Sequence, residues 1–194
     1  MTFNKCSINE TLYGYLYDKK DNEIEITDET TPLDFGWNPY YEKSFKFYDE
    51  SLVRAINDND ENCHRFFTLL CICHTVMSEM KDNVLTYQAQ SPDEAALVSA
   101  ARNFGFVFKS RTPKTITVSI VGEEKTYEVL NILDFNNVRK RMSVICRIDG
   151  KIVLYCKGAD TIIKERLAPE HLSDFALNED HLNVSYFHMK NLIF

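Results

Sequence analysis

The chain has 194 residues, a formal net charge of −7, and a composition that is 44% hydrophobic and 12% aromatic. Its length and apolar content predict one domain with a sizeable core, and its negative charge argues against a nucleic-acid binder, which usually carries a basic face. Apolar runs such as residues 66–72 are far shorter than the ~18 residues of a membrane span, and no signal peptide follows Met1. The sequence therefore predicts a soluble, cytosolic chain without a transmembrane segment.

The N-terminal part of the sequence predicts little regular structure. Short strands are expected within residues 3–8 and 12–17. Residues 19–44 are polar and acidic and are interrupted by Pro32 and Pro39, which predicts a surface loop with some disorder.

Residues 45–168 are expected to form the compact part, beginning with helices at 50–56 and 63–77. Cys63-His64 and Cys71-x-Cys73-His74 suggest zinc, but their spacing matches neither Cys-x-x-Cys nor His-x-x-x-His. The same segment carries apolar side chains at helical spacing. We therefore interpret it as a buried helix with reduced cysteines.

A strand at 85–88 leads to Ser91-Pro92-Asp93-Glu94, which is a strong helix start. Serine is a preferred N-cap, proline suits the first helical position, and glutamate at the third closes a capping box. The helix is expected to end at Gly105 in a left-handed turn. The residues alone leave two roles open for Glu94: a helix cap, or a cap that also accepts a bond from an adenine amino group.

Strands are expected after this helix. A hairpin is predicted at Asp149-Gly150, and a short helix capped by Asp160 is expected to reach Leu167. The expected strands are 106–108, 115–121, 126–135, 142–148 and 151–156, with 126–135 long, apolar and central. Strands joined by hairpins after grouped helices indicate an α+β fold, with a largely antiparallel sheet flanked by helices.

Two motifs near strand ends, together with the upstream Ser91-Pro92-Asp93-Glu94, predict a nucleotide pocket. Asp134-Phe135-Asn136 supplies an aromatic face, and Lys157-Gly158-Ala159-Asp160 supplies a cation. A buried purine nucleotide needs both, one for stacking and the other for charge and hydrogen bonds.

Arg139-Lys140-Arg141 forms a short basic run between two expected strands. It could belong to a nucleic-acid patch, a solvated turn or a positive rim for a triphosphate. The net acidity of the chain favours the last two.

Several motifs, in order, give the chain a resemblance to a known family. The chain resembles the nucleotide-binding domain of class IV P-type ATPases, the phospholipid flippases, from Met1 to about Ala176. The similarity includes Met1-Thr2-Phe3-Asn4-Lys5-Cys6-Ser7-Ile8, Cys73-His74-Thr75-Val76-Met77, Gln90-Ser91-Pro92-Asp93-Glu94, Ala101-Arg102-Asn103-Phe104-Gly105-Phe106, Asp134-Phe135-Asn136-Asn137, Arg139-Lys140-Arg141-Met142-Ser143 and Tyr155-Cys156-Lys157-Gly158-Ala159-Asp160.

The resemblance implies an ATP-binding role. It implies that Phe135 stacks on adenine, that Glu94 contacts the base region, and that Lys157, followed by Gly158, approaches the nucleotide. Arg141 is expected close to the phosphates. The whole flippase would move phospholipids to the cytosolic leaflet at the cost of ATP, with Mg²⁺ as a cofactor of the complete enzyme only. The similar subgroup pairs with a CDC50-type β-subunit in the plasma membrane or in secretory-pathway membranes such as those of the Golgi and endosomes.

Two departures from the family pattern shape the expected domain organisation. The family's Asp-Lys-Thr-Gly-Thr motif, on a neighbouring phosphorylation domain, is absent, so no catalytic residue is assigned and the chain alone is expected to be inactive as an ATPase. The family's Gly-Leu-Arg-Thr-Leu segment is replaced after Ala176 by an unrelated sequence. We expect a nucleotide-binding domain at 1–176 and a divergent tail at 177–194.

Three readings of the function remain open from the sequence. The chain is a flippase domain that retains weak ATP binding, or a truncated, non-catalytic remnant without activity, or an acidic α+β protein-interaction module. Nucleotide titration separates the first reading from the other two.

Overall fold

The computed structural model describes the chain except residues 1, 19, 21, 83, 185–191 and 194. Its main feature is an antiparallel sheet with the strand order β12-β11-β10-β9-β8-β7. The strands are β7 (Phe106–Arg111), β8 (Thr115–Ile120), β9 (Glu123–Leu133), β10 (Arg141–Ile148), β11 (Lys151–Gly158) and β12 (Leu192–Ile193). The predicted α+β fold with a largely antiparallel sheet is confirmed.

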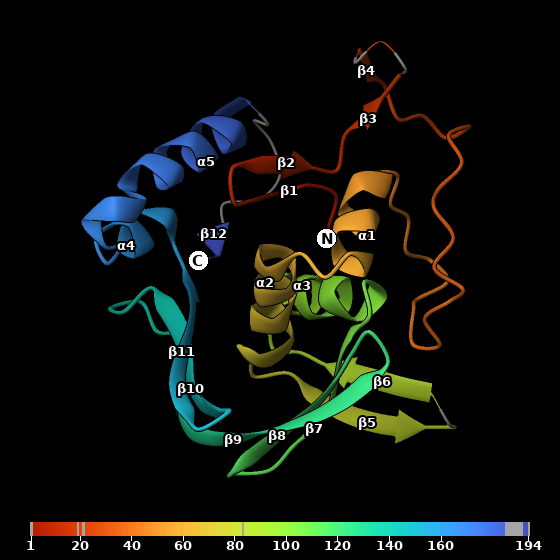
Figure 1. Ribbon diagram of the computed structural model, residues 1–194. Coiled ribbons are helices and arrows are strands. Elements are labelled where there is room, and N and C mark those ends of the chain that lie inside the picture. Colours follow the sequence, from red (N-terminus) through yellow and green to blue (C-terminus); the bar gives the residue numbers. More distant parts are fainter. Residues whose placement is uncertain (1, 19, 21, 83, 185–191, 194) are drawn as a thin grey trace.

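Helices lie along the concave side of this curved sheet and beside its β11–β12 end (Figure 1). Those near the concave side are α1 (Glu50–Asn57), α2 (Glu61–Ile72) and α3 (Pro92–Asn103). Those near the edge are α4 (Asp160–Lys164), a 3₁₀ turn (Pro169–His171) and α5 (Leu172–Val184). Across the part of the chain that the structure describes, no helix combines the length and the apolar character needed to cross a membrane.

Three two-stranded hairpins complete the described elements. They are β1 (Cys6–Ile8) with β2 (Thr11–Tyr13), β3 (Leu16–Tyr17) with β4 (Glu23–Ile24), and β5 (Met77–Lys81) with β6 (Val84–Gln88). The β5–β6 hairpin directly follows α2 and directly precedes α3, so it brings the end of one helix close to the start of the other (Figure 1).

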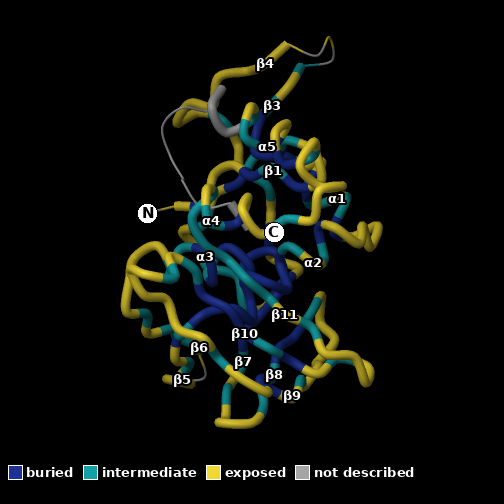
Figure 2. Tube along the Cα trace, turned by 90° about the vertical axis from the view of Figure 1, so that its left-hand side faces the viewer, coloured by how far each residue is buried: buried dark blue, intermediate teal, exposed yellow. Residues whose placement is uncertain are grey.

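The core lies between the helices and the sheet, where the dark segments gather in Figure 2. Within it, phenylalanine rings pack against one another, several of them edge to face, such as Phe47 on Phe104 with ring centroids 5.0 Å apart. Phe35 joins this cluster at 2% exposure, and Asn38 donates to the carbonyls of Arg102 and Asn103. Residues 31–44 contain no helix or strand, as a loop requires, but Phe35 and Asn38 anchor this segment in the core.

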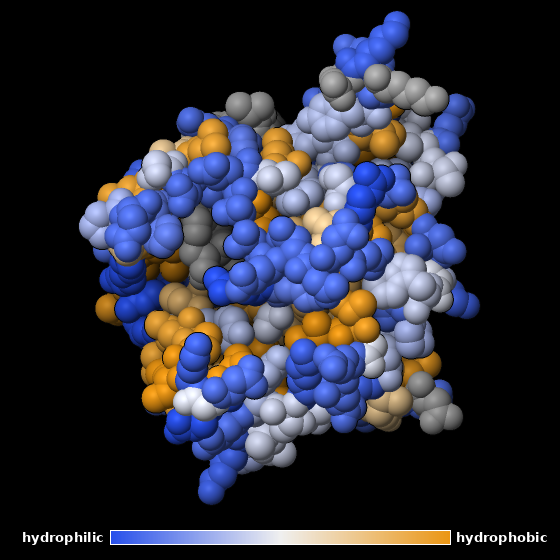
Figure 3. All heavy atoms as spheres, viewed as in Figure 1, coloured by the Kyte–Doolittle hydropathy of each residue, from blue (hydrophilic) through white to orange (hydrophobic). Residues whose placement is uncertain are grey.

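Exposed apolar side chains cover part of the opposite face. Ile152 and Leu154 on β11 are 66% and 59% exposed. Hydrophobic residues gather over β10 and β11 in Figure 3. The long central strand β9 is likewise exposed at most of its positions, because only one face of this sheet packs against helices.

The helix expected at 63–77 is wrong at its C-terminal end. It ends at Ile72, Cys73 leaves helical geometry with φ −88° and ψ 75°, and Met77 already belongs to β5. The strand and hairpin predictions hold better. Asp149 and Gly150 both take positive φ, as a tight two-residue hairpin turn requires.

The C-terminal elements differ from expectation in two respects. Asp160 is the first residue of α4, whose N-cap is Ala159, and its carboxylate accepts from the neighbouring Thr161 amide at 2.7 Å. Helix α5 runs through the expected domain boundary at residue 176. Asn178, beyond that boundary, is 5% exposed and accepts a hydrogen bond from Ser7 on β1.

Candidate functional site

A cleft of about 850 Å³ lies beside the N-terminus of α3 and the end of β11. Its volume falls within the ~300–1,000 Å³ typical of small-molecule sites. The lining residues are Thr75, Gln90, Ser91, Asp93, Glu94, Leu97, Asp134, Phe135, Asn137, Lys140, Met142, Lys157, Gly158 and Ala159. Segments far apart in the sequence therefore meet here: the turn after α2, the start of α3, the β9–β10 loop and the end of β11.

The structure brings four of the five predicted site residues to this cleft. Glu94, Phe135, Lys157 and Gly158 all line it. Arg141, the fifth, does not; its guanidinium donates to the Arg139 carbonyl at 3.1 Å. The neighbouring Lys140, which belongs to the same predicted basic run 139–141, lines the cleft instead.

Ser91 caps α3 as the sequence predicts, because its hydroxyl accepts the Glu94 amide at 3.1 Å. The second half of the capping box is not formed in the described structure. The Glu94 carboxylate turns toward Thr75, whose amide donates to Oε1 and whose hydroxyl donates to Oε2, both at 2.8 Å. Each carboxylate oxygen is therefore fixed by a donor from outside the helix.

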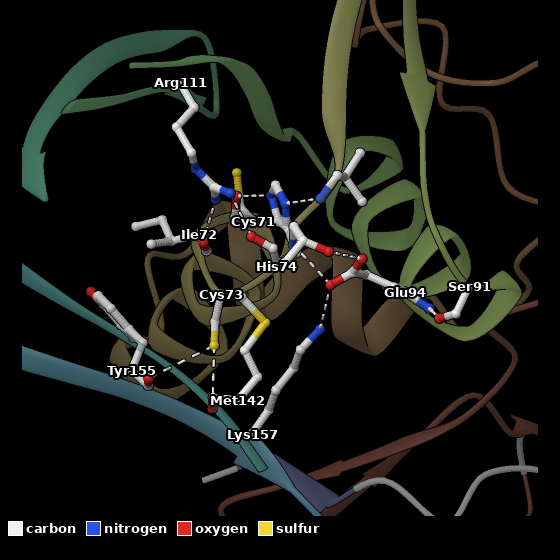
Figure 4. A network of polar contacts seen from close by, with 12 residues as sticks. Cys71, Ile72, Cys73, His74, Ser91, Glu94, Arg111, Met142, Tyr155 and Lys157 are labelled. Atoms are coloured by element: carbon white, nitrogen blue, oxygen red, sulfur yellow. Dashed lines mark hydrogen bonds and ion pairs between the residues drawn. The ribbon is translucent and has the colours of Figure 1, made fainter. Parts of the chain in front are cut away.

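Lys157 completes this polar corner of the cleft. Its Nζ lies 4.0 Å from Glu94 Oε1, and both side chains are 13% exposed. Burial lowers the pKa of Lys157, while Cys73 and Glu94 act in the opposite direction. Figure 4 shows Lys157 extending from β11 toward the carboxylate. The corner thus offers a carboxylate acceptor beside an ammonium donor.

Gly158 is required by close packing between β10 and β11. It pairs with Arg141 in the antiparallel register, and a Cβ at this position would lie 2.6 Å from Arg141 Cβ and 2.7 Å from the Lys140 carbonyl oxygen. Such contacts are far inside van der Waals distance. A glycine here lets the two strands close together at the floor of the cleft.

Phe135 forms the aromatic wall, and its side chain is 59% exposed. The loop that carries it is held by local hydrogen bonds. Asn136 Oδ1 accepts the amides of Val138 and Arg139, and the Arg139 guanidinium donates to the carbonyls of Leu133 and Asp134. An ordered loop therefore presents a largely open aromatic ring to the cleft.

Comparison with known proteins places this architecture in a family. A family model described as P-type ATPase, cytoplasmic domain N, matches residues 62–168, more than half of the chain. The chain belongs to this family. Its matched segment contains all five predicted site residues.

Relatives of this N domain have closely similar sequences. "Phospholipid-transporting ATPase ID" of Mus musculus is 56% identical over 185 residues, which are 94% of the chain and 15% of that protein. "Phospholipid-transporting ATPase IC" of Xenopus tropicalis is 57% identical over 173 residues, which are 88% of the chain and 13% of that protein. The resemblance to phospholipid-transporting ATPases is confirmed, and the chain spans only a small part of their length.

Sequence reasoning assigned no site role to Thr75, His74 or Arg111 in this N domain. As a candidate site residue, His74 was considered for zinc and rejected, and its ring contacts the Cys71 carbonyl and the Val76 amide. Among the described residues, no group of three or more His, Cys, Asp and Glu side chains could hold a metal ion. Thr75 lay within the motif 73–77 that supported the family resemblance, and this was the only available signal.

Proposed function

We propose that this N domain binds an adenine nucleotide in the cleft. The observation that carries the proposal is the pairing of an open aromatic ring, Phe135, with the buried polar corner of Glu94 and Lys157 in one cleft. Stacking on an aromatic ring stabilises a bound base by about 1–3 kcal/mol. A carboxylate can accept a hydrogen bond from an adenine amino group, and an ammonium group favours a polyanion.

The charges at the cleft support a nucleotide with phosphates. The chain as a whole is acidic, with a net charge of −7, yet Lys140 and Lys157 both line this cleft. Lysine is a common phosphate-binding residue. In the proposed arrangement the base lies between Phe135 and Glu94, and the lysines attract the phosphate chain.

The names of the relatives support a role in a larger transporter. In that role, ATP bound here donates its γ-phosphate to an aspartate on a separate phosphorylation domain, with Mg²⁺ supplied in the complete enzyme. The whole protein then moves phospholipids to the cytosolic leaflet of a plasma or secretory-pathway membrane, together with a CDC50-type β-subunit. This chain serves as the cytosolic nucleotide-binding domain of that transporter.

Nucleotide titration tests the proposal directly. Calorimetric titration of the 194-residue chain with ATP is expected to show saturable binding with one site. Amide chemical-shift changes during the titration are expected to concentrate at Thr75, Glu94, Phe135 and Lys157. Absence of saturation, or shifts concentrated away from these residues, would favour the remnant or interaction-module readings instead.

A further inference from the structure

The turn between α2 and β5 holds Thr75, the residue that fixes both oxygens of Glu94. This turn contains Cys73, His74, Thr75 and Val76, and it lies at the start of the cleft. Its backbone is held in place from both sides, by the His74 ring and by Arg111 (Figure 4).

The His74 ring is fully buried and bonds the backbone on either side of the turn. One ring nitrogen, Nε2, lies 2.8 Å from the Cys71 carbonyl oxygen, and Nδ1 accepts the Val76 amide at 3.1 Å. Because Nδ1 accepts, the proton must lie on Nε2, where it is donated to Cys71. Burial and the nearby positive charges of Arg111 and Lys157 lower the pKa of His74 well below its usual value, which keeps this neutral tautomer.

Arg111 reaches the same turn from β7. Its guanidinium donates to the His74 carbonyl at 2.6 Å and to the Ile72 carbonyl at 3.0 Å. Its buried Nε has no partner among the described residues, and no described carboxylate pairs with it in an ion pair. Burying a charged group with an unpaired donor is costly. Its two bonds satisfy carbonyls beside the end of α2 that an apolar side chain would leave unpaired, so Arg111 holds the backbone of the turn.

We propose that His74 and Arg111 are positioning residues that set the preference of the cleft for adenine over guanine. They do so by holding Thr75 in the conformation that directs its amide and its hydroxyl at the two oxygens of Glu94. The inference rests on the proposed adenine-nucleotide function and assigns the source of its base selectivity.

The selectivity follows from the acceptor capacity of a fixed carboxylate. Each oxygen of Glu94 has two lone pairs, and each accepts one donor from Thr75. Each oxygen can therefore still accept a hydrogen bond from the amino group of adenine, whereas it repels the 6-oxo group of guanine. A carboxylate that is free to rotate can turn away from guanine, which removes the repulsion. The same carboxylate must be ordered when adenine binds, which weakens the affinity for adenine. Loosening the turn is therefore expected to erode discrimination more than overall affinity.

The test measures ATP and GTP dissociation constants for the 194-residue chain and its variants by calorimetry. His74→Leu keeps the volume of the ring but removes both hydrogen bonds, and Arg111→Met removes both donors at similar length. Each is expected to lower the ratio of ATP to GTP affinity about three- to tenfold, the range for losing the hydrogen bonds that order one acceptor. His74→Asn, whose Oδ1 can still accept the Val76 amide, is expected to retain more of the ratio than His74→Leu.

The chain offers matched controls outside the cleft. His64 lies on α2, the helix that precedes the turn, with its Nε2 2.8 Å from the Ile56 carbonyl oxygen and its ring 5.1 Å edge-on from Phe106. His74 has the equivalent edge-on contact with Phe108 at 4.5 Å. Arg102 is a buried arginine that likewise donates to a backbone carbonyl, that of Tyr40. His64→Leu and Arg102→Met are expected to leave the ATP to GTP ratio unchanged.

The outcomes separate this inference from the proposed function. Equal affinities for ATP and GTP in the parent chain would show that Glu94 does not recognise the base. The inference would then have no basis. A preference that Glu94→Gln reduces but that both the His74 and Arg111 variants retain would overturn the positioning role alone. If the leucine and methionine variants do not fold, Arg111→Lys decides the matter, because an unchanged ATP to GTP ratio in this variant would overturn the positioning role. Arg111→Lys keeps the charge but cannot donate to both carbonyls as a planar fork does.

Discussion

The two walls of the cleft differ in how firmly the fold holds them. In the polar corner, Glu94 and Lys157 are each 13% exposed, and the carboxylate is bonded to Thr75 at both oxygens. On the aromatic wall, Phe135 is 59% exposed and the neighbouring Val138 is 92% exposed. Tertiary contacts hold the corner in place, whereas the Phe135 ring faces solvent that a bound ligand would displace. Substitutions in the corner should therefore change stability and binding together, and substitutions of the ring should change binding alone.

Glu94→Gln gives the largest expected effect because it acts on both properties. Loss of a charge-assisted hydrogen bond should weaken ATP binding by about 1.5–3 kcal/mol. An amide group must also face one Thr75 donor with its own NH₂, so the free energy of unfolding should fall by about 1 kcal/mol. Calorimetric titration and chemical denaturation measure the two changes.

Asp93→Asn is the control for Glu94→Gln, because Asp93 also lines the cleft and loses the same charge. Its effects on both measurements should be smaller, since no hydrogen bond to Thr75 is lost. Equal losses for the two variants would mean that net charge, and not the bonded carboxylate, governs the corner.

Phe135→Ala should weaken ATP binding by about 1–3 kcal/mol, as expected for loss of base–aromatic stacking. Phe135→Leu should recover only part of this, because it keeps apolar area but loses the π-face. The free energy of unfolding should stay within about 0.5 kcal/mol of the parent for both variants, since the ring is largely exposed. Titration and denaturation in parallel provide the check.

Val138→Ala is the matched control for the aromatic wall. Val138 belongs to the same loop but does not line the cleft, so its replacement should leave ATP affinity unchanged. A loss of affinity equal to that of Phe135→Ala would show that loop order, and not the aromatic face, is the source of binding.

Gly158→Ala tests how tightly the floor of the cleft is closed. The added Cβ would meet Arg141 Cβ at 2.6 Å and the Lys140 carbonyl oxygen at 2.7 Å. Such overpacking should lower the free energy of unfolding by about 1–3 kcal/mol. In Gly36→Ala the three atoms nearest the new Cβ all belong to the exposed Asp34 side chain, the closest at 3.0 Å, so the decrease in the free energy of unfolding, measured in urea, should be smaller. Similar decreases in the free energy of unfolding for the two variants would indicate that β10 and β11 can move apart at Gly158 without an energetic cost.

His74 gives the smallest expected effect, which appears as a dependence on pH. The lowered pKa of His74 in the folded chain means that below about pH 6.5, the usual histidine value, the unfolded chain binds a proton that the folded chain does not. The free energy of unfolding should therefore fall as the pH is lowered from 6.5, by at most about 1.4 kcal/mol per unit from this group. Urea denaturation between pH 7 and 5 measures the slope.

His74→Asn cannot titrate in this range, so its slope should be shallower than that of the parent. His64→Asn provides the matched comparison, because His64 lies on α2, the helix just before the turn, and has a similar edge-on ring contact. A parent slope identical to that of His74→Asn would show that the His74 ring takes up its proton without unfolding.

Local sequence signals predicted the elements whose geometry is set by a few neighbouring residues. Ser91 caps α3 through the Glu94 amide, Gly105 takes φ 88° after that helix, and Asp149-Gly150 turns the β10–β11 hairpin. Four of the five predicted site residues line the cleft, because strand ends and helix starts meet there once the strands pair.

The tertiary structure alone decided the end of α2 and the direction of Glu94. The apolar helical pattern of the sequence continues past Ile72, but the helix ends there. The His74 ring is hydrogen-bonded to the Cys71 carbonyl. Arg111, from β7, donates hydrogen bonds to the Ile72 and His74 carbonyls. That turn then brings Thr75 against Glu94, whose carboxylate leaves its own helix cap. A capping box depends on residues three apart, so the sequence can predict it. A stronger pair of donors from a distant turn can be seen only once the chain has folded.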